Sequence, residues 1–338
     1  MEKNKVTEKQ LEFLNRIKDL IPSNTSIVYE LSELLDLSTD SMYRRLRGET
    51  PLTFDEVVIL CNHFKISFDS FINLESGNVT FNYTLMEEGE NSFKKYLTSI
   101  RDDLKIIKAA KQHLITYACE DIPIFHNINS PKIASFKMLY WMKAILNLPS
   151  LEDIKYDSSL VSEDLIDLGQ EIYNLYSSIP SVEIWTDTTL TSTVKQIEFF
   201  WASGVFKSNK DAIEVYESLY NSIKKIEKQA EAGTKILESN NPDENVDNYS
   251  FYVSEIELTN NCVLVNLGNV KAVYIGHLSF NTMNTSNATY CKETEKWLNN
   301  IIRKSTLISK VAEKTRYQFF NGMYNYLDDV IEKIKNTE

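Results

Sequence analysis

Apolar residues recur three or four positions apart in several short runs before residue 75, and polar residues separate these runs. This spacing places the apolar side chains on one face of a helix, which is typical of an amphipathic helix. We therefore predict a first helix within residues 1–20 and four short helices with sharp joints within residues 25–74. The apolar positions of the first three predicted helices are Leu11, Phe13, Leu14, Ile17 and Leu20, then Ile27, Val28, Leu31, Leu34 and Leu35, then Met42 and Leu46.

Local signals set the boundaries of these helices. Ser38 stands where its side chain can cap a new helix, and Gly48 stands where that helix ends in a left-handed conformation. Thr53 and Glu56 have the spacing of a capping box at the start of the next helix. The helix between Ser38 and Gly48 has an apolar side and a polar side. The polar side collects Thr39, Asp40, Tyr43, Arg44 and Arg47.

After residue 79 the pattern is mixed, with β-rich segments between long helical runs. The polar segment 75–79 contains glycine and predicts a boundary between a domain at 1–75 and a larger α+β domain at 80–338. Three β-rich segments joined by short turns predict a β-meander at 249–258, 262–267 and 270–278. Further predicted strands are 113–118 and 182–186, and predicted helices are 91–111, 132–146, 162 onward, 191–203, 209–232 and a helix or helix pair at 290–335.

Two short helices joined by a tight turn, the second cationic and followed by glycine, match the helix-turn-helix pattern. Residues 1–75 resemble the five-helix DNA-binding domain of lambda-repressor-like, or xenobiotic-response-element-type, transcription regulators. The resemblance rests on Leu31-Ser32-Glu33-Leu34-Leu35, residues 38–46, Arg47-Gly48-Glu49, residues 54–64 and Ile66-Ser67-Phe68-Asp69-Ser70-Phe71. It implies a multidomain fold, with an all-α five-helix domain followed by the larger α+β domain.

Two residues depart from the pattern of this family. Asp36 stands where many relatives have glycine in the turn between the two helices. Arg45 stands where many relatives have an aliphatic residue. A long arginine side chain can lay its carbon stem along an apolar surface and keep its charge in water. We therefore expect Arg45 to reach the surface while Leu46 fills the core.

The resemblance also implies which residues contact DNA. Arg44 is expected to read guanine through a bidentate contact, because its planar fork matches the O6 and N7 acceptors. Asp40 is expected to accept from cytosine or else to orient an arginine. The full set of expected DNA contacts is Thr39, Asp40 and Arg44 at base edges, Ser41, Tyr43, Arg45 and Arg47 at phosphates, and Thr25 and Ser26 near the start of the second helix.

Charge complicates this interpretation. The chain carries a net charge of −12, which argues against a protein that coats nucleic acid non-specifically. Even residues 1–75 contain 9 Lys and Arg against 13 Asp and Glu. The arginines are nevertheless clustered, and no Asp or Glu lies between Ser41 and Gly48. A local cationic face of this kind predicts weak non-specific binding and a strong dependence on salt.

Enzyme chemistry finds little support in the sequence. There is no glycine-rich phosphate loop and no HExxH or GxSxG motif. The segments VEIWT and VYIGHL resemble strands of sensor domains with a phospholipase-D-like fold, whose catalytic pattern needs a lysine two residues after a histidine. In the α+β region, the histidines His113, His126 and His277 are followed at that position by Ile, Ile and Ser. We expect no enzyme activity, no cofactor and no metal site.

These patterns favour a cytoplasmic bacterial transcription regulator that binds double-stranded DNA in a sequence-specific manner. No signal peptide precedes the first predicted helix and no apolar run approaches 18 residues, so we expect no membrane partner. One such domain contacts few base pairs, so we expect a homodimer. The α+β domain is expected to serve sensing or oligomerisation, with an unidentified small-molecule effector. The alternatives are a protein-interaction module that no longer binds DNA and an enzyme with a helix-turn-helix appendage.

Overall fold

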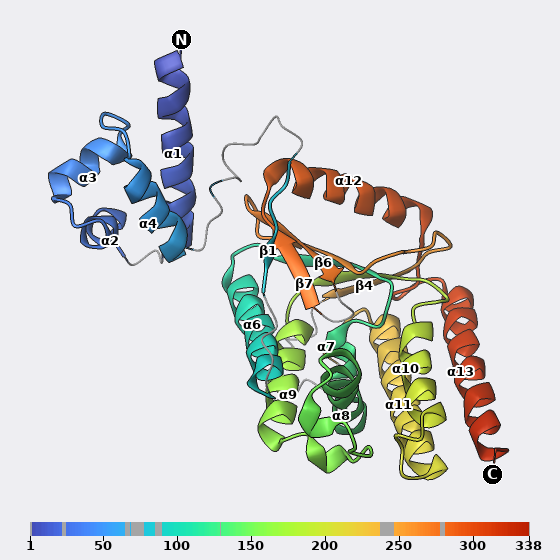
Figure 1. The fold of residues 1–338 in the computed structure, drawn as a ribbon. Coiled ribbons are helices and arrows are strands. Elements are labelled where there is room, and N and C mark those ends of the chain that lie inside the picture. Colours follow the sequence, from blue (N-terminus) through green and yellow to red (C-terminus); the bar gives the residue numbers. More distant parts are fainter. Residues whose placement is uncertain are drawn as a thin grey trace. The chain divides into compact units, whose positions relative to one another are not determined.

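The computed structural model describes residues 2–21, 25–64, 68, 78–84, 90–128, 130–236, 247–277 and 281–337. The chain divides into two compact units, residues 1–82 and 83–338 (Figure 1). Each unit has its own hydrophobic core, built only from its own residues. Residues 75–77 of the boundary segment expected from the sequence lie outside the described residues.

The described residues of the first unit fold mainly into helices. Its helices are α1 (Glu2–Leu20), α2 (Ile27–Leu34), α3 (Thr39–Leu46) and α4 (Phe54–Phe64). Apolar side chains from all four helices meet in one core, as their spacing in the sequence predicts. The buried members of that core are Phe13, Leu14, Ile17, Ile21, Val28, Leu31, Met42 and Leu60. Apart from Phe68, the fifth helix expected at residues 67–74 lies outside the described residues.

The second unit is built on one mixed sheet. Its described strands are β1 (Asn82–Tyr83), β2 (Leu114–Cys119), β3 (Ser181–Trp185), β4 (Tyr249–Val253), β5 (Cys262–Asn266), β6 (Lys271–His277), β7 (Asn281–Thr285) and β8 (Thr306–Leu307). They follow the order β1-β7-β6-β5-β2-β3-β4-β8. Strands β2, β3 and β4 are parallel, whereas β5, β6 and β7 form antiparallel pairs beside β2. Strand β8 is antiparallel to β4.

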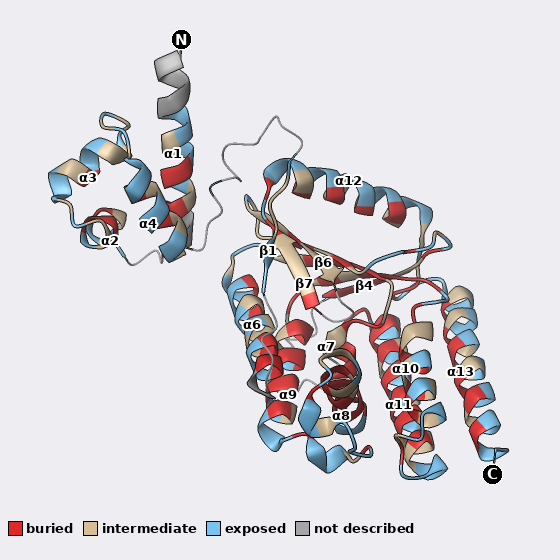
Figure 2. Ribbon diagram, in the orientation of Figure 1, coloured by how far each residue is buried: buried red, intermediate tan, exposed pale blue. Residues whose placement is uncertain are grey.

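Helices cover both faces of this sheet (Figures 1 and 2). Helix α12 (Ala288–Lys304) packs on one face, and the other described helices of this unit lie on the opposite side. These are α6 (Glu90–Ala109), α7 (Ile124–Asn127), α8 (Pro131–Tyr140), α9 (Glu163–Ser177), α10 (Thr191–Ala202), α11 (Asn209–Ala232) and α13 (Glu313–Lys335). Alternating residues of the strands β2 to β6 enter the two cores, as the pleat of a strand requires. In β3, Ile184 belongs to the α12 side and Trp185 to the other.

The expected β-meander is wrong in one respect. Strands β5, β6 and β7 do run as an antiparallel meander, but β4 is separated from β5 by β2 and β3. Strand β4 pairs in parallel with β3, which it reaches after the long helices α10 and α11. A β-rich segment signals its own conformation but not the strand it pairs with, so the sequence pattern predicts pairing between neighbours in the chain that are separated in the sheet. The sequence pattern predicts neither β7 nor the short strand β8.

The apolar helix expected at 132–146 is shorter than expected. Helix α8 ends at Tyr140 and continues as a turn of π-helix over Trp141–Ile145. Its aromatic side chains belong to the core, where Phe136 lies 5.6 Å from Phe200 between ring centroids. The aromatic cluster of this region therefore stabilises the helical layer.

A carboxylate lies at the centre of the second unit. Glu183 of β3 is fully buried and accepts hydrogen bonds from Trp185 Nε1 (2.8 Å) and from the Tyr249 hydroxyl (2.9 Å). Tyr176 donates a third, and His126 Nε2 lies 2.9 Å away. Burial opposes ionisation, but the charge of His126 and these hydrogen bonds outweigh it and lower the Glu183 pKa to about 2.

Candidate nucleic-acid interface

The joint between α2 and α3 is a tight turn with a strained residue at its centre. Asp36 has a φ of 51°, in the left-handed region that glycine adopts at least cost. The Leu37 amide donates to the Ser32 carbonyl at 2.9 Å and closes the turn. Ser38 then caps α3 by accepting from the Ser41 amide at 3.3 Å, which confirms the predicted cap. Aspartate thus stands at a position where the backbone conformation favours glycine.

Helix α3 separates its polar and apolar sides as predicted. Met42 is fully buried, and Leu46 packs on the same core. The side chains on the opposite side are exposed, and Tyr43 has a relative exposure of 50%. The exposed residues of this helix and its end are Thr39, Asp40, Tyr43, Arg44 and Arg47, with Ser41 half-buried beside them. We call these six residues the α3 face.

Arg45 does not reach the surface as expected. Its Nε and Nη2 atoms donate to the two carboxylate oxygens of Glu56 at 3.0 and 2.7 Å, and both side chains are only 12% exposed. Glu56 also accepts from the Thr53 amide at 2.9 Å, while Thr53 Oγ1 accepts from the Glu56 amide, so the predicted capping box is confirmed. Burial opposes the ionisation of Glu56, but its bonds to Arg45 and Thr53 lower its pKa.

A glutamine from α1 holds the segment that links α3 to α4. Gln10 Nε2 donates to the carbonyls of Arg45 and Thr50, each at 2.9 Å. Its Oε1 accepts from the Leu52 amide at 2.9 Å. One side chain thus bonds three backbone groups in the last turn of α3 and the segment after it, and the Leu52 amide and Thr50 carbonyl lie beyond the helix. Gln10 therefore fixes the orientation of α3 in this unit.

Every arginine in this region faces a carboxylate. Arg44 Nε lies 3.4 Å from Asp40 one turn earlier, and both side chains are more than half exposed. Arg47 donates to the two oxygens of Glu49 at 2.7 and 3.0 Å, which raises the pKa of Arg47 and lowers that of Glu49. The local positive potential is therefore weaker than the sequence run of arginines suggests. Glu49 and Glu56 lie outside the segment between Ser41 and Gly48, so the absence of acids from that segment does not reveal their ion pairs with the arginines.

The start of α2 is the other part of the expected interface. Ser26 occupies the N-cap position, where its carbonyl accepts from the Glu30 amide, but its side chain makes no capping bond. Thr25 and Ser26 are both exposed. Their hydroxyl groups are therefore available to a ligand at the N-terminal end of α2.

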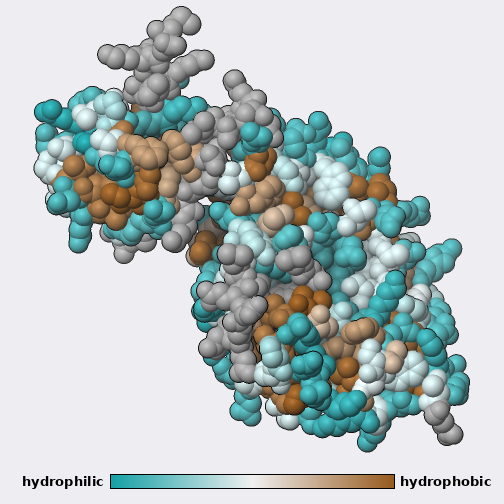
Figure 3. Space-filling model, viewed as in Figure 1, coloured by the Kyte–Doolittle hydropathy of each residue, from teal (hydrophilic) through white to brown (hydrophobic). Residues whose placement is uncertain are grey.

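An apolar patch lies on α4 of the same unit. Phe54 is 74% exposed, and Val58 and Ile59 are about 40% exposed. Figure 3 shows brown, apolar side chains gathered on the visible face of the first unit. Phe54 and Val58 are one helical turn apart, so they lie on the same side of α4.

Comparison with known proteins does not identify the chain: no protein-family model, curated protein or solved structure matches it. Within the described residues, no group of three or more His, Cys, Asp or Glu side chains is arranged to hold a metal ion. None of the helices in the described part of the chain combines the length and apolar character needed to span a bilayer.

Proposed function

We propose that the first unit is a lambda-repressor-like domain that binds double-stranded DNA through the α3 face, and that the chain is a transcription regulator. The α3 face carries the proposal. Its polar side chains point away from the core on a helix that follows α2 after a tight turn, which is the arrangement in which a recognition helix enters the major groove.

Arg44 is the residue that we propose to read a base. Its contact with Asp40 is an exposed ion pair, and such pairs contribute roughly 0–1 kcal/mol. A bidentate contact to guanine contributes about 1–3 kcal/mol of discrimination. Replacing part of the ion pair with Asp40 by this contact is therefore favourable. Asp40 would then hold the guanidinium in the plane of the base. Thr39 and Ser41 are close enough to the N-terminus of α3 to contact neighbouring bases and phosphates.

Arg47 and the start of α2 would bind the phosphate backbone. Arg47 is exposed and paired with the equally exposed Glu49, a pair that a phosphate can replace. Thr25 and Ser26 would contribute hydroxyl groups and backbone amides at the N-terminus of α2. Arg45 is assigned to the core and not to phosphate, because Glu56 already uses its fork. The few remaining cations predict modest affinity for each domain, so we propose a homodimer on paired half-sites.

Selection of bound duplexes from a random pool, at near-physiological salt, tests this function. The expected result is an enriched palindromic sequence. Arg44→Ala should then weaken binding to that sequence by about 1–3 kcal/mol and relax the base preference at one position in each half-site. Arg303→Ala on α12 removes the same charge from an exposed site outside the first unit and serves as the control. Equal affinity and selectivity in Arg44→Ala would exclude the assigned contact.

One observation favours a second function, a protein-interaction module. The exposed apolar side chains of α4, with Phe54 the most exposed, form the kind of surface that protein partners cover. The net negative charge of residues 1–75 points in the same direction. A folded chain that enriches no duplex would favour this alternative over DNA binding.

A further inference from the structure

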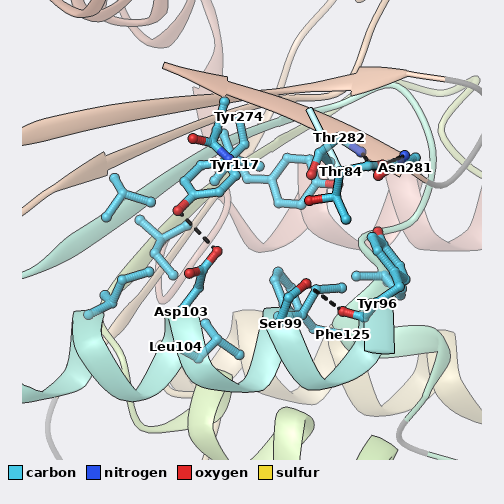
Figure 4. Close-up of a pocket in the computed structure, with 17 residues that line it drawn as sticks. Thr84, Tyr96, Ser99, Asp103, Leu104, Tyr117, Phe125, Tyr274, Asn281 and Thr282 are labelled. Carbon is cyan, nitrogen blue, oxygen red and sulfur yellow. Dashed lines mark hydrogen bonds between the residues drawn. The ribbon is translucent and has the colours of Figure 1, made fainter. Parts of the chain in front are cut away.

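A cavity of about 260 Å³ lies between α6 and the sheet of the second unit (Figure 4). Helix α6 supplies one wall with residues three or four positions apart, and β2, β5, β6 and β7 supply the opposite wall. Its volume is close to the lower end of the range for ligand pockets, about 300–1,000 Å³, so it suits a small molecule. The apolar lining residues are Ile100, Leu104, Ile107, Ile115, Ile124, Phe125, Val263 and Val265.

One carboxyl group interrupts this apolar lining. Asp103 lies on the face of α6 between Ile100 and Leu104, and Figure 4 shows it pointing toward the sheet. Its Oδ2 accepts from the Tyr274 hydroxyl at 3.2 Å. Within the described part of the chain its Oδ1 accepts no hydrogen bond. Burial raises the pKa of Asp103, so the site holds an acceptor that solvent does not fully stabilise.

Aromatic rings from both walls line the cavity that holds this carboxyl group. Tyr96 extends from α6, while Tyr117 and Tyr274 extend from the sheet (Figure 4). The Tyr117 hydroxyl has no hydrogen-bond partner among the described residues. The faces of such rings carry negative potential and attract cations. The Asp103 carboxylate and the aromatic rings therefore both favour a positively charged ligand.

Among the described residues that line the cavity there is no Lys, Arg or His. The nearby Arg101 pairs instead with Asp102 and lies 3.8 Å from Glu171. An anionic ligand would place a second negative charge beside Asp103 with nothing to balance it. A cation would balance that charge directly.

We propose that this cavity binds a small organic amine, with the protonated nitrogen on Asp103 and the apolar skeleton against α6 and β5. The aromatic side chains Tyr117 and Tyr274 flank the nitrogen, and Phe125 contacts the skeleton. This site belongs to the second unit alone, so the proposal does not depend on DNA binding by the first.

Calorimetric titration of the full chain near pH 7.5 tests the amine site with three probes of the same skeleton. The probes are 2-phenylethylamine, neutral 2-phenylethanol and anionic 3-phenylpropionate. The amine should bind at least about tenfold more tightly than the other two, because hydrogen bonds to a charged group are stronger than neutral ones. Asp103→Asn keeps the shape of the side chain and should reduce the amine affinity by about tenfold, with little effect on the alcohol.

Two further variants make the result decisive. Asp102→Asn removes the adjacent, half-exposed carboxylate that pairs with Arg101, and it should leave amine binding unchanged. Ile100→Trp enlarges a half-buried lining residue and should abolish binding of every probe. The proposal is overturned by absent amine binding in the folded chain, by equal or tighter binding of the carboxylate, or by unchanged amine affinity in Asp103→Asn.

Discussion

Asp36 occupies a backbone conformation that few side chains tolerate. Its φ of 51° costs less for aspartate than for a β-branched residue, because a short polar side chain can bond locally. We predict that Asp36→Val destabilises the first unit by about 1–2 kcal/mol, whereas Asp36→Gly changes its stability by less than about 1 kcal/mol. Hydrogen exchange of the α2 and α3 amides measures both effects. Equal protection in the two variants would exclude strain at this turn.

Ionisation of Glu183 makes the stability of the second unit depend on pH. Its folded-state pKa of about 2 lies below the usual value of 4.5, so the ionised carboxyl contributes stability above pH 4.5. That contribution is lost as the pH falls from 4.5 toward 2. We predict that Glu183→Gln lowers the free energy of unfolding at pH 6 by on the order of 3 kcal/mol. The difference in free energy of unfolding between this variant and the parent should become smaller as the pH falls toward 3.

Urea unfolding followed by tryptophan fluorescence measures this prediction. Glu171→Gln is the matched control, because Glu171 is a partly exposed carboxylate that pairs with Lys105 on the surface. Its stability difference from the parent should stay small at every pH. A constant difference between Glu183→Gln and the parent from pH 6 to pH 3 would argue against an ionised carboxyl at the centre of the core.

At the scale of elements, the pair of Arg45 and Glu56 joins α3 to α4. Removing one partner of a nearly buried pair leaves the other charge without compensation. We predict that Glu56→Gln lowers the stability of the first unit by about 2 kcal/mol, which allows for the remaining 12% exposure of both side chains. Glu49→Gln breaks an equally close but exposed pair with Arg47 and should have little effect on stability.

Circular dichroism at 222 nm during urea unfolding compares these two variants. Glu49→Gln has a second use, because it frees Arg47 on the α3 face and should tighten DNA binding if the proposed function holds. Equal losses of stability in the two variants would mean that the nearly buried pair of Arg45 and Glu56 stabilises the first unit no more than the exposed pair of Arg47 and Glu49.

At the scale of the whole molecule, the two units have separate cores and should unfold separately. All four tryptophans, Trp141, Trp185, Trp201 and Trp297, belong to the second unit. We predict that tryptophan fluorescence reports one unfolding transition while circular dichroism reports two, because the first unit contributes helices but no tryptophan. Residues 83–338 expressed alone should keep the fluorescence midpoint of the full chain. Coincident transitions by both probes would show that the units unfold together.

Local sequence determined much of this protein. The capping box at Thr53, the cap at Ser38 and the helical spacing of Met42 and Leu46 all involve residues within four positions of one another, so the sequence alone predicts α3 and α4. The burial of the apolar side of α3 follows from the same spacing. The long helix α11 was predicted at its observed bounds, Asn209–Ala232, for the same reason. Such signals need no knowledge of what a segment packs against.

Only the tertiary structure determines which distant side chains and which strands pair with one another. Glu56 is eleven residues from Arg45, and Tyr274 is 171 residues from Asp103, so no local spacing connects either pair. The parallel position of β4 beside β3 and the contacts of Glu183 with His126 and Tyr249 are likewise set by tertiary packing. The sequence of a segment determines its conformational preference. Tertiary packing of the segments against one another determines which residue pairs with a buried charge.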